Sequence, residues 1–255
     1  MNIENFFSSE FLKNSEECER YEEFLTRIFS FQKPDFSFGV ERFYSSESVG
    51  KKVENSGGFR HFFGDTVVFD LEDSAKRLLQ EYYISPLYQV APDCLAEKLK
   101  ESTLHMTLHD LNASDVKEPW VMEKLFDTEI IISEIIKRAN IKNKTIKMIT
   151  TCVFNMVNTS LVLGLRPKSE EDYYELMSLY FLIENFYPLP YRLTPHITLA
   201  YYSRFGFEDE RLKVLQNLVN ELNGENFEIT LSTDRLYYQK FTSMNEYFHI
   251  MPFVR

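Results

Sequence analysis

The chain has 255 residues, of which 44% are hydrophobic and 26% charged, and its formal net charge is −11 at pH 7. This composition is ordinary for a globular protein, and the length suffices for one sizeable core or two small ones. An acidic surface opposes the many phosphate contacts that hold long DNA or RNA, which excludes long nucleic acid as the expected partner and favours small nucleotides or short oligonucleotides.

The sequence carries no signal for a membrane or for an oxidising compartment. No stretch approaches the roughly 20 apolar residues of a membrane span, and the N-terminus lacks the basic and apolar regions of a signal peptide. The 3 cysteines are scattered and odd in number, which favours reduced thiols over a disulfide framework or a zinc site. We therefore expect a cytoplasmic protein with no membrane partner.

Residues 1–60 are predicted to be an N-terminal extension to a main domain that spans residues 61–255. A helix is expected from Ser15 to Phe29, because apolar residues there recur at helical spacing, and Pro34 would end it. Glycines then indicate short strands and a flexible loop before the first strand of the main domain. This loop carries basic residues and could cover a groove as a lid, or it could be a plain surface loop.

The main domain alternates between strand and helix patterns. The predicted elements, in chain order, are a strand at 66–71, a helix at 72–83, a helix or turn at 93–100, a strand at 103–108, a helix at 118–139 interrupted near 126, a hairpin of strands 144–157 and 160–165, a helix at 169–185, a strand at 195–202, a helix at 208–222, and strands at 226–232 and 235–241.

A histidine-apolar-threonine-apolar tetrad occurs twice, once in each half of the main domain. The tetrads are 105–108 and 196–199, and they use 2 of the 5 histidines in the chain. Both lie in predicted strands, whose period of two places His105 with Thr107, and His196 with Thr198, on one face. Each half therefore offers one proton-transfer group and one hydroxyl donor on a face that would look into a solvated groove, while the apolar partners face the core.

With these twin tetrads, the chain resembles the 2H phosphoesterase superfamily, which includes RNA 2′,5′-ligase-like proteins and cyclic phosphodiesterases. The segments 63–69 and 104–110 are most similar to a less-studied bacterial and fungal branch of it. The resemblance covers about residues 60–240 and implies an α+β, bilobal fold. Its two pseudo-symmetric lobes would have antiparallel sheets that line a central groove, with helices outside.

The resemblance implies a phosphodiesterase that needs no cofactor and no metal. One imidazole would act as general base and the other as general acid, while Thr107 and Thr198 hold the phosphate oxygens. We assign His196 as base and His105 as acid, and the roles exchange with the direction of bond cleavage. The expected substrate is a 2′,3′-cyclic or 2′,5′-linked nucleotide or short oligonucleotide.

Substrate-binding residues are expected around the tetrads. Strand alternation places Tyr202 on the face of His196, where a base could stack on it, and places His109 on the face of His105. An i, i+4 pair such as His105 and His109 suits zinc on a helix, but the strand pattern disfavours a metal here. Many RNA-ligase-like members follow the second tetrad with an arginine, which this chain lacks at that place. The phosphate would then be held by cationic or loop residues, for which the candidates are Arg166, Arg192, Arg60 and His61.

Two other functions remain open on the sequence. The groove could bind or sense a nucleotide without turnover, although binding alone does not need two titrating groups. The protein could also be purely structural, with its acidic N-terminal helix docking a partner.

Overall fold

The computed structural model describes residues 8–15, 18–33, 42–139 and 141–254. Within these residues, eight strands pair into one antiparallel sheet, and two short strands, β1 and β7, pair separately. The bounds of the strands are β1 (Arg42–Phe43), β2 (Phe63–Asp70), β3 (His105–Ser114), β4 (Thr145–Met156), β5 (Ser160–Pro167), β6 (His196–Tyr201), β7 (Phe207–Glu208), β8 (Glu228–Ser232), β9 (Leu236–Ser243) and β10 (Glu246–Pro252).

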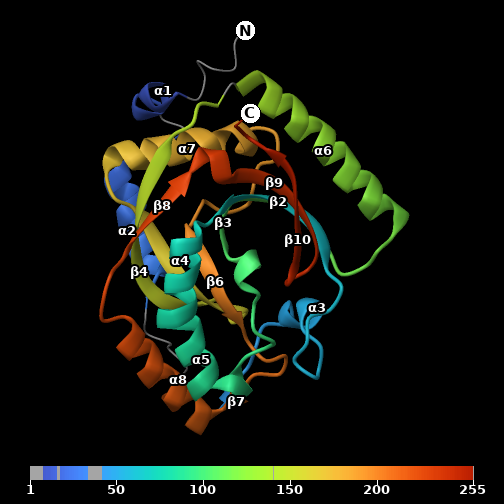
Figure 1. Ribbon diagram of the computed structural model, residues 1–255, viewed down its shortest axis with the longest axis vertical. Coiled ribbons are helices and arrows are strands. Elements are labelled where there is room, and N and C mark those ends of the chain that lie inside the picture. The colour runs from blue at the N-terminus through green and yellow to red at the C-terminus, as the bar shows by residue number, and fades with distance from the viewer. Residues whose placement is uncertain (1–7, 16–17, 34–41, 140, 255) are drawn as a thin grey trace.

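The sheet consists of two lobes of four strands each. Its order is β10, β9, β2, β3 in one lobe and β6, β5, β4, β8 in the other, and Figure 1 shows it strongly curled. In the described register of β3 and β6, the lobes meet at one backbone pair, Met106 opposite Ile197. These residues follow the histidine in their respective tetrads, so the pairing indicates a pseudo-twofold axis that exchanges the lobes. The predicted α+β fold of two antiparallel lobes is confirmed.

Helices surround the sheet (Figure 1). Helix α7 packs against β3, β4 and β5, and α8 packs against β4 and α5. In the described part of the chain, no helix has both the length and the apolar content to cross a membrane. The bounds of the helices are α1 (Ser9–Lys13), α2 (Tyr21–Phe31), α3 (Val49–Lys52), α4 (Asp73–Leu78), α5 (Ser85–Val90), α6 (Pro119–Ala139), α7 (Glu170–Glu184) and α8 (Asp209–Leu222).

The apolar residues of both tetrads lie in the core, as the strand pattern predicted. Met106, Leu108, Ile197 and Leu199 are all buried to 1% exposure or less. They belong to one large hydrophobic cluster that spans both lobes and the surrounding helices. This anchoring fixes the two tetrad strands at the centre of the sheet, and their polar side chains then face away from the core.

Several elements differ from the sequence prediction. The helix expected to end at residue 83 continues through a π-helical turn, 79–84, into α5, which has Pro86 in its first turn. Helix α6 is not interrupted at Phe126, whose side chain is 60% exposed and lies off the buried face. Strand β10 was not predicted. It pairs along β9 at the edge of the sheet.

The described part of residues 1–60, which the sequence predicts to be an N-terminal extension, packs into the same core as the main domain. Phe24 and Ile28 of α2 are fully buried in the same hydrophobic cluster as the sheet. Phe43 of β1 is also buried there, and β1 pairs with β7 from the C-terminal half. Helix α2 begins at Tyr21 rather than near residue 15, and the predicted stop at Pro34 lies outside the described residues. The hydrophobic pattern of a helix shows that one face is buried, but not against which part of the chain.

Candidate active site

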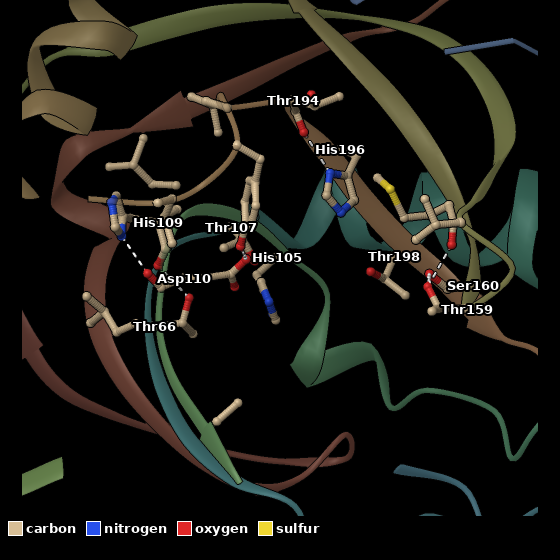
Figure 2. A pocket seen from close by; sticks show the side chains of 18 of the residues that line it. Thr66, His105, Thr107, His109, Asp110, Thr159, Ser160, Thr194, His196 and Thr198 are labelled. Atoms are coloured by element: carbon tan, nitrogen blue, oxygen red, sulfur yellow. Dashed lines mark hydrogen bonds between the residues drawn. The ribbon is translucent and has the colours of Figure 1, made fainter. Parts of the chain in front are cut away.

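Both tetrads line one cleft between the lobes. The cleft has a volume of about 1120 Å³, and its wall includes His105, Thr107, His196 and Thr198. Figure 2 shows the two imidazoles and the two threonines projecting into this shared space from β3 and β6. The structure thus brings together the four residues that sequence alternation selected. The volume lies slightly above the usual range for small-molecule pockets, about 300–1,000 Å³, and suffices for a nucleotide or a short oligonucleotide.

Each tetrad strand has a β-bulge at the same place, directly after its threonine. On β3, Thr107 pairs with Val68 and the next paired residue is His109, which leaves Leu108 unpaired. On β6, Thr198 pairs with Val162 and the next paired residue is Ala200. An extra residue reverses the alternation of side chains beyond it. The bulges therefore determine which residues after each tetrad face the cleft.

Beyond the bulges, Asp110 and Tyr201 take equivalent places in the two lobes. Each lies three residues after its tetrad threonine, and both line the cleft. The Asp110 carboxylate accepts a hydrogen bond of 2.8 Å from the Tyr191 hydroxyl. The Lys52 ammonium of α3 lies 5.3 Å from the centre of the Tyr201 ring. One lobe thus contributes an acid to the cleft, and the other contributes an aromatic ring beside a cation.

The two histidines are held in the same way by the backbone. Nδ1 of His105 lies 2.7 Å from the Thr103 carbonyl oxygen, and Nδ1 of His196 lies 2.7 Å from the Thr194 carbonyl oxygen. Because a carbonyl oxygen can only accept, each Nδ1 carries the proton and donates it. Each neutral ring therefore has its unprotonated nitrogen at Nε2, the atom available to a ligand.

Burial lowers the pKa of both histidines. The pKa of His105 falls to about 4, chiefly by desolvation and in part by the nearby His196. The pKa of His196 is also lowered by desolvation. The negative charge of Asp110 opposes this lowering at both rings. Both imidazoles therefore remain neutral at pH values at which an ordinary histidine is already protonated. A bound anion would favour protonation of one of them.

His109 contributes to the wall of the cleft, but its ring is not available to a substrate in the way that the sequence predicted. Beyond the bulge at Leu108 its side chain no longer shares the face of His105, and the residue is 1% exposed. Its Nε2 lies 2.8 Å from Glu184 on α7, and its Nδ1 lies 2.6 Å from the Asp110 carbonyl oxygen. Both ring nitrogens are thereby paired within the protein.

The prediction that Tyr202 stacks on a base is wrong. The bulge after Thr198 turns Tyr202 into the core, where it is 0% exposed and packs against Phe43 and Phe207. Its neighbour Tyr201 faces the cleft instead. The alternation of residue types along the strand does not reveal the bulge, because the leucine at position 199 gives no sign that the pairing shifts there.

Among the cationic and loop candidates, the structure places Arg192 in the cleft wall and the other three elsewhere. Arg192 is largely exposed and lies 3.4 Å from Glu19. Arg166 donates to the Pro167 carbonyl oxygen, away from the cleft. The exposed residues Arg60 and His61 do not line it either. Arg60 donates to the Gly50 carbonyl oxygen, and His61 stacks on Phe63.

Several cleft residues were not selected as site residues from the sequence, and three of them come from segments outside the tetrad strands. Arg27 comes from α2, Lys52 from α3, and Tyr247 from β10. The Tyr247 ring centre lies 5.1 Å from that of His105. Lys52 had a sequence signal, as a basic residue in the predicted lid loop. The other two had none, because they reach the cleft only through the packing of distant segments.

In the described residues, no group of three or more histidine, cysteine, aspartate or glutamate side chains is arranged to hold a metal ion.

No protein-family model matches the sequence, and no curated protein matches it. Among solved structures, the chain is similar to ATU0111 from Agrobacterium tumefaciens, a conserved protein of unknown function, with 17% identity and a TM-score of 0.58 over 83% of this chain and 94% of that chain. Two further structures are similar, and in each case 75% of this chain and 95% of the other chain are covered. One is a phosphoesterase, with 14% identity and a TM-score of 0.45. The other is apo LigT from Escherichia coli, with 14% identity and a TM-score of 0.42. The bilobal sheet, with one tetrad strand from each lobe at its centre, is the architecture that the sequence resemblance implied. The chain therefore shares its α+β fold with ATU0111.

Proposed function

We propose that this protein is a metal-independent phosphodiesterase that acts on a 2′,3′-cyclic or 2′,5′-linked nucleotide or short oligonucleotide. One observation carries the proposal. Two histidines at equivalent places each use Nδ1 to bind a backbone carbonyl, which leaves Nε2 of each ring available in the same cleft. A pair of proton-transfer groups that face one ligand is what general acid–base cleavage of a phosphodiester requires.

In hydrolysis of a cyclic phosphodiester, one Nε2 removes a proton from the attacking water while the new P–O bond forms. As the old P–O bond breaks, the other imidazolium gives its proton to the leaving ribose oxygen. Thr107 and Thr198 lie two residues beyond their histidines on the same face and donate hydrogen bonds to the non-bridging oxygens. Each turnover exchanges the protonation states of the two rings, and proton exchange with solvent restores them.

The pKa of His105 indicates which histidine acts as acid and which as base in the first turnover. The pKa of His105 is lowered to about 4, partly by the charge of His196. The strong lowering at His105 indicates that His105 is the neutral ring when the pair holds one proton, so His105 would act as base and His196 would carry the proton to be donated, which reverses the assignment made from the sequence.

The remaining cleft residues suit a small anionic ligand with an aromatic base. Lys52 lies over the rings of Phe62 and Tyr201, and the described residues include no carboxylate paired with its ammonium. Stacking of a base on such a ring contributes about 1 to 3 kcal/mol. The acidic overall charge of −11 disfavours a long nucleic acid at the same place.

The test is a panel of nucleoside 2′,3′-cyclic phosphates and 2′,5′-oligoadenylates, incubated with the protein in EDTA and resolved by chromatography. We expect turnover that EDTA does not reduce, and a loss of about 10²- to 10⁴-fold in kcat for both His105→Ala and His196→Ala. His249→Ala is the matched control, because that histidine stacks on Tyr237 outside the cleft and its variant should keep full turnover.

Two results would contradict the proposal. Normal turnover in both cleft variants would remove the histidines from the chemistry, and a loss of activity in EDTA would point to a metal. A ligand-induced rise in Tm without product from any substrate would instead favour a binding or sensing module.

A further inference from the structure

The second tetrad is preceded by a segment, 193–195, that holds His196. The carbonyl of Thr194 accepts the hydrogen bond from His196 Nδ1, and the carbonyl of Pro195 accepts one from the Leu165 backbone N–H. This segment has no regular secondary structure. The orientation of His196 therefore depends on what holds the Thr194 carbonyl in place.

Arg27 of α2 holds this segment from one side. Its guanidinium donates to the Leu193 carbonyl oxygen at 3.0 Å and to the Thr194 hydroxyl at 3.3 Å. Glu19 fixes the guanidinium itself through both carboxylate oxygens at 2.9 to 3.1 Å. A bidentate arginine pair has a defined geometry, so Arg27 is a rigid support rather than a mobile surface charge.

Gln32, directly after α2, holds the segment from the other side. Its amide nitrogen donates to the Pro195 carbonyl oxygen at 3.2 Å, and its amide oxygen accepts from the Thr151 hydroxyl at 2.7 Å. The residue is 4% exposed. A buried polar side chain that is satisfied on both atoms has one favoured orientation, because any other would leave buried groups unpaired.

The sheet leaves room for Gln32 at the position opposite His196. Gly164 pairs with His196 across β5 and β6. A Cβ atom at Gly164 would lie 2.7 Å from Cδ of Gln32 and 2.3 Å from the Thr151 hydroxyl oxygen, which is closer than real Cβ contacts allow. Only glycine at this position lets the glutamine cross the face of the strand beside His196.

We propose that Arg27 and Gln32 are positioning residues for His196, and that helix α2 and the residue after it thereby set the geometry of the candidate active site. They hold segment 193–195 so that the Thr194 carbonyl keeps the proton on Nδ1 and leaves Nε2 toward the cleft. His105 has a different support, because its carbonyl partner Thr103 belongs to a 3-10 turn, 101–103, next to the first tetrad. Loss of the α2 contacts should therefore affect one histidine of the pair.

The test uses the full chain, with the histidines labelled with ¹⁵N, and records their ring-nitrogen spectra from pH 4 to 8.5. Gln32→Met keeps the length of the side chain and removes its hydrogen bonds, and Arg27→Lys keeps the charge and removes the fork that bridges Glu19 and Leu193. In both variants we expect His196 to lose its single Nδ1–H tautomer and its pKa to move toward the ordinary histidine value of about 6.5. The His105 signals should stay as in the wild type.

Tyr21→Phe is the matched control on the same helix. The Tyr21 hydroxyl donates to the Pro167 carbonyl oxygen at 3.0 Å, so its removal weakens the attachment of α2 without touching segment 193–195. This variant should leave both histidines unchanged. The proposal is overturned if the His196 signals stay unchanged in both test variants, or if Tyr21→Phe shifts them equally.

The consequence for turnover rests on the proposed function and is measured separately. Misplacement of a reacting group by about 1 Å can cost about 10²-fold, so kcat should fall by about 10- to 100-fold in Gln32→Met with little change in KM. If the wild type cleaves no phosphodiester but the tautomer of His196 still responds, the proposed function fails and the positioning role stands. If the wild type is active and the tautomer does not respond, the positioning role fails alone.

Discussion

At the scale of single residues, the two cleft histidines are alike in their backbone contacts and different in their surroundings. His105 lies beside the Tyr247 ring and opposite Asp70 in the pairing of β2 with β3. His196 lies beside the segment held by α2. This asymmetry lets two equivalent rings have different proton affinities, which a reaction with one acid and one base requires.

The lowered pKa values predict the pH at which the proposed phosphodiesterase is most active. The form that reacts holds one proton on the pair, and its population in the free protein peaks between two apparent pKa values that both lie below the ordinary value of about 6.5. Above this range, the acid loses its proton, so kcat/KM should be higher at pH 5.5 than at pH 8. Steady-state rates from pH 4.5 to 9 measure this profile.

The Asp110→Asn variant tests the same pH profile, because its kcat/KM can be compared with that of the wild type at each pH. Because the Asp110 carboxylate raises the pKa of both histidines, its removal should move the alkaline decline of kcat/KM to lower pH. A kcat/KM that stays level or rises from pH 6 to 8.5 in the wild type would disagree with a lowered pKa at the two histidines.

At the scale of elements, the two bulges determine which side chains after each tetrad face the cleft. The same insertion after Thr107 and after Thr198 turns the side chains of Asp110 and Tyr201 into the cleft, and on β6 it turns Tyr202 into the core. Because both bulges have the same position in their tetrads, the two strands keep their pseudo-symmetry while the chemistry of the two lobes differs.

The bulge on β6 predicts opposite effects for adjacent tyrosines. Tyr202 is fully buried, and its hydroxyl oxygen has no hydrogen-bond partner among the described residues. Tyr202→Phe removes that unsatisfied group, so the free energy of unfolding should stay equal or rise by about 1 kcal/mol, with kcat unchanged. Tyr201→Leu should instead raise KM by about 10-fold, through loss of a ring from the cleft wall.

Urea denaturation and steady-state kinetics on the same two variants distinguish these effects. A raised KM in Tyr202→Phe together with a normal KM in Tyr201→Leu would mean that strand alternation continues without the bulge.

At the scale of the whole molecule, the N-terminal helix belongs to the same folded unit as the two lobes. Phe24 packs against Tyr173 of α7 with ring centres 4.8 Å apart, and α2 also supplies Arg27 to the cleft. The fold therefore places a wall of the candidate site on a segment that precedes both tetrads in the chain.

This packing predicts a large difference between two phenylalanines on one helix. Phe24 is 0% exposed and Phe29 is 48% exposed. Phe24→Ala should lower the free energy of unfolding by about 3 to 5 kcal/mol, because it leaves a cavity in the core, whereas Phe29→Ala should change it by less than about 0.5 kcal/mol. Denaturant titration measures both values. Similar small effects would mean that α2 is a dispensable extension.

The sequence by itself determined the tetrads, the strands that carry them, the β4–β5 hairpin and helices α7 and α8, because local periodicity and capping specify such elements. It also placed the histidine and threonine of each tetrad on one face, since a period of two separates polar from apolar faces, and the tertiary structure brought the two faces into one cleft. The residues around them were decided by the tertiary structure. Bulges turned Tyr202 into the core and left the His109 ring paired with α7, and long-range packing brought Arg27 and Tyr247 to the cleft. Registers and packing partners depend on contacts between distant segments, and no local pattern in the chain encodes them.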